Sequence, residues 1–380
     1  MRRLFFLSAF SWLAAASATA QLIQTEANFA VIMDAGSGEI LFEKNGETPM
    51  VPASMTKVMT AYLVFERLRS GEISLDDRLP VSENAWRRGG WSSGGSTMGL
   101  SIGETPTIRD LMRGVIVLSG NDACIVLAEG LSGSEELFAA EMTEAAQRMG
   151  LTTASFKNVS GLFDEGHVIS AADMARLAKA TITEFPEYYD FYAEPEMTWN
   201  GITQANRNPI LGKMEGVDGL KTGHLSVSGY GLVASALRGD ERRIIVINGL
   251  SSVAARRQEA DRLMRTAFDA FETRTIEADG TILADLDVWL GEDASVGVAL
   301  GDPLSVTAHK RAFVSAVSEI VYSGPLEAPI TKGDQVAELV ITLDDKGSVR
   351  VPLVATRDVE KLGFIGRAVE GLSRRLEADS

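Results

Sequence analysis

Apolar runs and helical spacing alternate along the first part of the chain. Residues 29–33 and 40–42 are apolar and flank an Asp-Ala-Gly-Ser-Gly segment, which predicts two strands joined by a turn. Pro52 then stands where a helix can begin, and the pattern predicts a helix over 54–68. Apolar positions at similar spacing predict further helices at 108–118, 122–131, 135–149 and 171–181.

The pattern of apolar and polar residues changes twice in the second part of the chain. The apolar runs 231–234 and 243–247 predict buried strands, and 254–272 predicts a helix. Strands at both ends of this region, with helices between them, predict one mixed sheet. From about residue 275, short apolar runs are broken by turn pairs such as Asp-Gly and Lys-Gly, which is typical of a small all-β module.

The first twenty residues predict a cleavable secretory signal. Arg2 and Arg3 precede an apolar run over 4–16, and Ala-Thr-Ala follows at 18–20, so we expect cleavage before Gln21. The apolar run is shorter than the ~20 residues that a spanning helix needs. We therefore expect an exported protein.

The last twenty residues, 361–380, predict an amphipathic helix. Its apolar residues recur at spacings of three and four, on one face: Leu362, Ile365, Val369, Leu372 and Leu376. Two interpretations stay open. The helix lies weakly on a membrane surface as an anchor, or it packs on the protein as an ordinary terminal helix.

Composition and charge exclude several classes of protein. The 380 residues are 45% hydrophobic, enough for one large core and a second module. The formal net charge is −16 and becomes −18 without Arg2 and Arg3, which argues against nucleic acid as a partner. Cys124 is the only cysteine, and the three histidines are far apart in the sequence, so we predict no disulfide, metal or cofactor.

The first motif with chemical content is Ser-Met-Thr-Lys at 54–57. Ser54 and Lys57 are three apart at the start of a predicted helix, so their side chains share a face. A serine hydroxyl needs a base to become a nucleophile, and a lysine can be that base only when its amine is neutral. Moving a lysine pKa from ~10.4 to near 7 corresponds to ~4–5 kcal/mol against the charged form. Burial and a second cation, for which we nominate Lys221, are the available causes.

Two later motifs complete a candidate site. Ser119 and Asn121 are two apart in Ser-Gly-Asn, where the hydroxyl can relay a proton and the amide can hold a peptide or the lysine. Lys221, Thr222 and Gly223 precede an apolar run, and the glycine allows a substrate chain to lie close to the backbone. We expect the backbone N–H groups of Ser54 and His224, which follows Gly223, to form an oxyanion hole.

Each motif taken singly has an ordinary structural explanation. Ser54 could be a helix cap, Lys57 a surface charge and Lys221 a charge at a strand end. Ser-x-Asn also occurs a second time, at 82–84, whereas Ser-x-x-Lys and Lys-Thr-Gly each occur once. The three motifs in this order nevertheless favour a serine acyl-transfer enzyme with a lysine base.

These residues resemble the penicillin-binding D-alanyl-D-alanine carboxypeptidases of low molecular mass, peptidase family S11. The likeness covers nearly the whole chain. It is carried by Pro-Ala-Ser-Met-Thr-Lys at 52–57, Ser-Gly-Asn-Asp-Ala-Cys at 119–124, Asn-Arg-Asn at 206–208 and Val-Asp-Gly-Leu-Lys-Thr-Gly-His at 217–224.

The resemblance implies a fold and a reaction. The fold is an α/β (mixed α+β) serine β-lactamase/transpeptidase-like domain with an antiparallel sheet and helices at 21–272, then a small all-β domain at 273–360. The substrate is a peptidoglycan stem peptide ending in D-Ala-D-Ala, and β-lactams mimic it. Ser54 attacks with Lys57 as base, Ser119 passes the proton on, and Arg207 with Thr222 receives the terminal carboxylate.

Other functions share this apparatus. A β-lactamase needs a deacylating base, typically in a Glu-x-x-Leu-Asn loop, and no such sequence occurs here. An endopeptidase acting on D-Ala cross-links, and a non-catalytic peptidoglycan-binding sensor or scaffold, stay open. Leu225, where the family usually has threonine, bears on substrate preference. The glycine-rich segment 88–99 is predicted to be a loop, either idle or a lid, and we assign no catalytic role to His167 or Asp173.

Overall fold

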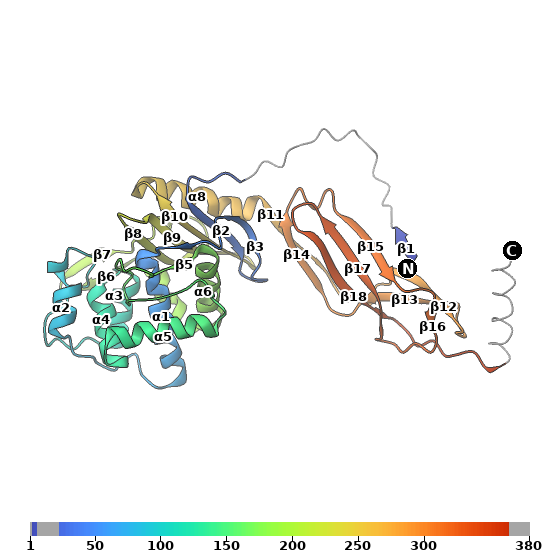
Figure 1. The fold of residues 1–380 in the computed structure, drawn as a ribbon, viewed down its shortest axis with the longest axis horizontal. Coiled ribbons are helices and arrows are strands. Elements are labelled where there is room, and N and C mark those ends of the chain that lie inside the picture. Colours follow the sequence, from blue (N-terminus) through green and yellow to red (C-terminus); the bar gives the residue numbers. More distant parts are fainter. Residues whose placement is uncertain (1, 6–22, 365–380) are drawn as a thin grey trace. The chain divides into compact units, whose positions relative to one another are not determined.

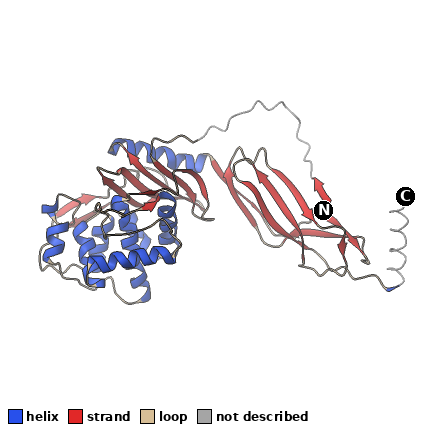
Figure 2. Ribbon diagram, in the orientation of Figure 1, coloured by secondary structure: helices blue, strands red, loops and turns tan. Residues whose placement is uncertain are grey.

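The computed structural model describes residues 2–5 and 23–364 (Figure 1). The chain divides into two compact units, one spanning 21–269 and the other made of 1–20 and 270–380. The first unit mixes helices and strands, and the second is built of strands (Figure 2). The predicted fold class is confirmed.

A five-stranded antiparallel sheet is the frame of the first unit. Its strands lie in the order β3-β2-β10-β9-β8, and every neighbouring pair is antiparallel. The central strands carry runs of buried residues because both faces of the sheet are covered. The bounds are β2 Phe29–Asp34, β3 Ile40–Lys44, β8 Val217–Leu225, β9 Gly229–Arg238 and β10 Glu241–Leu250.

Helices cover both faces of this sheet. Helix α8 packs on one face, and α6 with the other long helices lies against the opposite face (Figure 1). In α8 the buried residues recur at spacings of three and one, which makes the single apolar stripe of a surface helix. The bounds are α1 Lys57–Ser70, α2 Glu83–Gly89, α3 Ile108–Ile116, α4 Asn121–Ser132, α5 Glu135–Arg148, α6 Ala171–Glu184, α7 Pro186–Tyr189 and α8 Val253–Asp269.

Helix α1 is the centre of the helical layer. Its first nine residues are all buried, so this helix is covered on every side and not only along one stripe. The lysine at its first position is therefore taken into the core along with its apolar neighbours. Two further sheets have two strands each: β4 Pro49–Met50 pairs with the distant β5 Ile169–Ser170, and β6 Glu196–Trp199 forms a hairpin with β7 Ile202–Ala205.

Three predicted helix boundaries were wrong by three residues. The helix predicted over 171–181 continues to Glu184, and the other two errors fall at junctions between elements. The helix predicted from residue 54 begins at Lys57, because Ala53–Thr56 form a tighter 3-10 turn ahead of it. The helix predicted to reach residue 272 ends at Asp269, and Phe271 already begins strand β11. The helical spacing of apolar residues continues across these two junctions. The α-helical hydrogen bonds nevertheless stop at the 3-10 turn in the first case and at the pairing of strand β11 in the second.

The second unit is a sheet structure with its own apolar core. Its largest sheet has the order β1-β15-β17-β18-β13-β12-β16, and β11 pairs with β14. Fully or nearly buried residues from several strands meet in that core, among them Leu286, Val298, Ile320 and Leu353. The bounds are β1 Arg2–Phe5, β11 Phe271–Ile276, β12 Ala284–Trp289, β13 Ser295–Leu300, β14 Leu304–His309, β15 Val317–Tyr322, β16 Leu326–Glu327, β17 Gln335–Leu343 and β18 Gly347–Ala355.

The two predicted terminal segments fall mostly outside the described residues. From the predicted signal, residues 2–5 form strand β1 and pair with β15, whereas 6–20 are not described. The predicted C-terminal helix extends past residue 364, where the description ends. Among the helices that are described, none has the length and apolar character to cross a membrane.

Candidate active site

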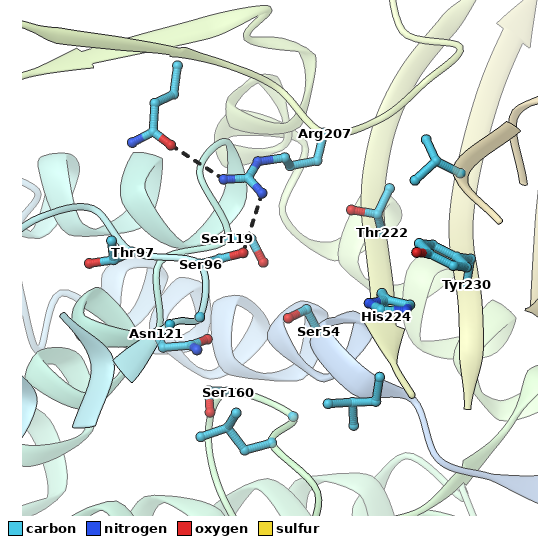
Figure 3. A pocket seen from close by; sticks show the side chains of 18 of the residues that line it. Ser54, Ser96, Thr97, Ser119, Asn121, Ser160, Arg207, Thr222, His224 and Tyr230 are labelled. Carbon is cyan, nitrogen blue, oxygen red and sulfur yellow. Dashed lines mark hydrogen bonds between the residues drawn. The ribbon is translucent and has the colours of Figure 1, made fainter. Parts of the chain in front are cut away.

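Residues from all three motifs line one cavity of about 510 Å³ (Figure 3). Ser54 enters it from the 3-10 turn before α1, Ser119 and Asn121 from the start of α4, and Thr222 from strand β8. The structure thus brings together segments that are far apart in the sequence. Further lining residues are Trp91, Gly94, Gly95, Ser96, Thr97, Ser160, Gly161, Leu162, Gln204, Arg207, Gly223, His224, Leu225, Tyr230, Val253 and Arg256.

Lys57 is buried directly beneath Ser54, and three oxygen atoms surround its amine. The Nζ atom lies 2.9 Å from Ser54 Oγ, 2.8 Å from Asn121 Oδ1 and 2.6 Å from the Ser160 carbonyl oxygen. The amide and carbonyl oxygens can only accept hydrogen bonds. In a neutral amine they take both N–H groups, so the remaining lone pair faces the Ser54 hydroxyl. This is the arrangement that a base needs.

The surroundings of Lys57 favour that neutral form. Burial lowers the pKa of Lys57, and the positive charge of Arg207 lowers it further, whereas Asp122 acts in the opposite direction. Burial also lowers the pKa of Lys221 well below its ordinary value, with Lys57 as the first of the cations that add to the effect. Burial, the expected cause, is the main one for both lysines. The cation that helps to lower the pKa of Lys57 is Arg207 and not the nominated Lys221.

The second motif is held in a strained turn. Ser119 has φ of 61°, in the left-handed region that costs a non-glycine residue roughly 1–2 kcal/mol. Ala53, next to Ser54, has φ of 49° and shares this feature. Strained backbone of this kind is concentrated at functional sites, where the surrounding packing holds it in place. Both turns present a serine to the same cavity.

Asp122 fixes the glycine-rich segment that the sequence predicts to be a loop. Its carboxylate is fully buried and accepts hydrogen bonds from the Thr97 hydroxyl at 2.6 Å and from backbone N–H groups of Met98, Gly99 and Leu100 at 2.8–3.1 Å. The Ser96 carbonyl also accepts from the Asn121 N–H at 2.8 Å. The predicted loop at 88–99 is correct only from residue 94 onward, because residues 88–89 end helix α2 and Trp91–Ser93 form a 3-10 turn. The hydrogen bonds to Asp122 and Asn121 hold the end of the loop against the second motif.

The third motif lies inside a strand and not before one. Lys221, Thr222 and Gly223 belong to β8, an edge strand of the sheet. A Cβ at Gly223 would lie 2.6 Å from the Pro52 carbonyl oxygen, so no larger residue fits between β8 and the turn that carries Ser54. His224 stacks its ring on Tyr230 of β9, with centroids 3.9 Å apart. Its ring therefore packs on the sheet, and its backbone is what lies next to the motif.

Two arginines give the cavity a cationic side. The Arg207 guanidinium lies 3.4 Å from both Ser96 Oγ and Gln204 Oε1. Figure 3 marks the contact between Arg207 and Ser96 with a dashed line. Arg256, from α8, is 8% exposed and reaches the carbonyl oxygens of Gly223 and Gly231 at 3.5 Å. The described residues that line the cavity include no acidic side chain, although the whole chain carries a net charge of −16. The cavity is therefore suited to an anionic ligand.

Sequence reasoning missed three contributors to this site. The Ser160 carbonyl is a backbone group and leaves no residue-type signal. Arg256 is one of several basic residues in an amphipathic helix, and only the fold selects it. Asp122, by contrast, directly follows Asn121 in the sequence, so its position next to the second motif could have identified it as part of the site. Within the described ranges, no three His, Cys, Asp or Glu side chains converge in a way that could hold a metal ion.

Comparison with known sequences identifies related proteins for both units. The family profile of D-alanyl-D-alanine carboxypeptidase, peptidase S11, matches residues 14–251, and that of the penicillin-binding protein 5 C-terminal domain matches 271–361. The chain is 38% identical over 357 residues to the D-alanyl-D-alanine carboxypeptidase DacC of Escherichia coli, covering 93% of this chain and 89% of that protein.

Solved structures give the same result. Penicillin-binding protein 5 from Haemophilus influenzae superposes with a TM-score of 0.73 at 35% identity, over 89% of this chain and 98% of that one. Penicillin-binding protein D2 from Listeria monocytogenes, in its ampicillin-bound form, superposes with a TM-score of 0.58 at 29% identity. That match covers 65% of this chain and 99% of the Listeria protein.

The lowered pKa of Lys57 predicts a pH-dependent contribution to stability. Between the folded pKa and the ordinary value of ~10.4, the unfolded chain binds a proton that the folded chain does not, so wild-type stability rises with pH. Relative to Lys57→Met, the wild type should gain about 1.4 kcal/mol per pH unit within that window. Urea unfolding of both proteins at a series of pH values measures this gain, and the exposed Lys213→Met is the matched control. A difference that stays constant with pH would contradict the prediction.

Proposed function

The chain belongs to the D-alanyl-D-alanine carboxypeptidases of peptidase family S11, and from this membership we propose how its residues carry out the reaction. The protein is a serine-type D-Ala-D-Ala carboxypeptidase that acts on peptidoglycan outside the cytoplasm and binds penicillin covalently. The observation that carries the proposed mechanism is the 2.9 Å contact between Ser54 Oγ and the buried Lys57 amine.

In the acylation step, Lys57 takes the hydroxyl proton of Ser54 while Ser54 Oγ bonds to the carbonyl carbon of the penultimate D-alanine. The carbonyl oxygen becomes an oxyanion, which the backbone N–H groups of Ser54 and His224 stabilise. The C–N bond then breaks, and Ser119 passes the proton from Lys57 to the departing amine. Asn121 keeps Lys57 oriented by accepting one of its N–H groups, and Lys221, buried in strand β8, is proposed to hold the substrate together with Thr222 and Gly223.

Water completes the cycle. It adds to the Ser54 ester, the C–O bond to Ser54 breaks, and the shortened peptide leaves with Ser54 protonated again. A β-lactam acylates the same hydroxyl through its strained amide. None of the described residues lining the cavity is acidic, so no carboxylate stands ready to activate water against a bulky penicilloyl group. This supports a carboxypeptidase that retains penicillin over a β-lactamase that turns it over.

The terminal carboxylate of the substrate is proposed to bind Arg207 and Thr222. Both line the cavity, and Arg207 is held in place by contacts to Ser96 and Gln204. A guanidinium presents parallel N–H donors that match a carboxylate. Gly223 lets the turn that carries Ser54 pack against β8. Since β8 is an edge strand, the peptide backbone is proposed to lie along it in the manner of an added strand.

The nucleophile is tested by labelling with a fluorescent penicillin and mapping the labelled peptide. We expect wild-type protein to carry the label on Ser54 and to release D-alanine from a stem pentapeptide. Ser54→Ala and Lys57→Met should each lose at least about a thousandfold in labelling rate, since removing the nucleophile or its base removes the chemistry. Ser82→Ala, in the unrelated Ser-x-Asn sequence, is the matched control. Label on another residue, or a labelled Ser54→Ala protein, would refute the assignment.

The carboxylate site is tested by pairing Arg207→Ala with a substrate whose terminal carboxylate is amidated. Losing a charge-assisted hydrogen bond of about 1.5–3 kcal/mol should raise KM for the acid by roughly 10- to 100-fold. Wild-type enzyme should lose as much with the amide, and Arg207→Ala should no longer distinguish acid from amide. If Arg207→Ala still prefers the acid as strongly as wild type, the carboxylate belongs to Arg256 instead.

Export and membrane association extend the proposal to the chain ends. Residues 1–20 have the three-part pattern of a secretory signal, which supports removal before Gln21 and a periplasmic or outer-face location. The apolar face of 361–380 supports weak attachment to the membrane surface. In the order of the chain, the β-rich unit comes after the catalytic unit and before the proposed anchor.

Membrane attachment is tested by a chain that ends at Lys361. We expect this truncated protein to move from the membrane fraction to the soluble fraction, because the apolar face of residues 362–376 is gone. Leu372→Glu in the full-length chain should shift the distribution in the same direction, since it places a charge in that face. Penicillin labelling should be unchanged in both proteins. Fractionation identical to wild type would argue for the alternative, a terminal helix packed on the protein.

A further inference from the structure

His167 is a buried histidine close to the site, and its neighbours define its protonation. It is 1% exposed, and the backbone N–H of Lys157 donates to its Nδ1 at 3.1 Å. The Nδ1 atom must therefore be unprotonated, and Nε2 carries the ring proton. Nε2 lies 2.8 Å from Thr56 Oγ1, so the ring donates to that hydroxyl. Burial lowers the pKa of His167 to about 4, which keeps the ring neutral.

These two hydrogen bonds join two segments of the site. Thr56 lies between Ser54 and Lys57 in the turn that carries the nucleophile. Lys157 opens a turn over 157–162, which closes around Asn158: its Oδ1 accepts from the N–H groups of Ser160, Gly161 and Leu162 at 3.3, 2.8 and 3.1 Å. His167 thus ties this turn to the nucleophile turn.

The two turns touch without room for adjustment. A Cβ on Gly161 would lie 1.9 Å from the Ala53 carbonyl oxygen, so the backbones are in direct contact there. Thr60 donates to the Val159 carbonyl at 2.7 Å and adds a second contact along α1. The group that this packing presents to the site is the Ser160 carbonyl, 2.6 Å from Lys57 Nζ.

The position of that carbonyl determines what the Lys57 amine does. With the Asn121 and Ser160 oxygens accepting its two N–H groups, the lone pair is left for Ser54. If the Ser160 carbonyl moved away, the freed N–H group would find its nearest alternative acceptor in Ser54 Oγ. Lys57 would then donate to the nucleophile in place of accepting its proton.

We propose that His167 is a positioning residue for acylation: by joining Thr56 to the 157–162 turn, it fixes the Ser160 carbonyl that orients the Lys57 amine toward Ser54. The inference rests on the proposed role of Lys57 as the base. His167 does not line the substrate cavity and acts only through the 157–162 turn, so its effect should fall on the chemical step more than on ligand binding.

The test separates binding from chemistry with stopped-flow acylation by a fluorescent penicillin. His167→Leu should lower the first-order acylation rate about five- to tenfold, the rate equivalent of one hydrogen bond, with the pre-covalent dissociation constant within about twofold of wild type. His167→Gln, whose amide can accept from Lys157 and donate to Thr56, should restore most of the rate. Thr56→Val and Thr56→Ser form a second, nearly isosteric pair with the same expected contrast, and they decide the matter if His167→Leu does not fold.

Three results would overturn the inference: His167→Leu or Thr56→Val acylating at the wild-type rate, binding weakened as much as acylation, or no recovery in His167→Gln and Thr56→Ser. Lys57→Met in the same assay distinguishes this failure from failure of the proposed function. If Lys57→Met acylates normally, the proposed function is wrong. If Lys57→Met is inactive while His167→Leu behaves as wild type, only the role of His167 is wrong.

Discussion

The Lys57 amine lies inside the protein between three oxygen atoms, and the chemistry of the site follows from that placement. Helix α1 is buried on all sides, so its first residue is drawn out of water together with the apolar residues behind it. Removing an ammonium group from water disfavours its charge, and this lowers the pKa of Lys57 toward the neutral form that the proposed base requires. Burial alone would leave the amine free to donate to Ser54. In the proposed mechanism, the acceptor-only oxygens of Asn121 and Ser160 take the two N–H groups and leave the lone pair for the Ser54 hydroxyl.

Close backbone contacts hold these parts together. Gly161 lies against the Ala53 carbonyl and Gly223 against the Pro52 carbonyl, so the loop after α5 and the edge strand β8 both abut the nucleophile turn. On the far side of the cavity, Asp122 accepts from the Thr97 hydroxyl and from the backbone N–H groups of 98–100, and so fixes the wall that faces β8. The positive φ values of Ala53 and Ser119 are tolerated because this packing leaves the turns no alternative. The charge of the cavity differs from that of the whole chain. The chain carries a net negative charge, whereas the charged side chains that line the cavity are cationic.

Much of the fold could be predicted because hydrophobic periodicity is a local property. The strands at 29–33 and 231–234, the helices of the first unit and the all-β texture after residue 275 all follow from spacing and turn residues. The errors lie at the ends of elements. Ser54 is in a 3-10 turn, and Lys221 is inside β8. Backbone hydrogen bonds to neighbouring segments decide where an element begins, and the spacing of apolar side chains does not show where those bonds form.

Residue identity and order alone were sufficient to select Ser54, Lys57, Ser119, Asn121 and Lys221 as candidates and to relate the chain to its family. The reaction requires particular side-chain functional groups, and the sequence states directly which residues carry them. Tertiary structure alone decided that Lys57 meets an amide 64 residues away and a carbonyl 103 residues away. It also decided that Arg256 lines the cavity and that His167 contacts Thr56. Such contacts depend on how turns and helices pack in three dimensions. A backbone carbonyl is present at every position, so only the fold distinguishes the one at Ser160.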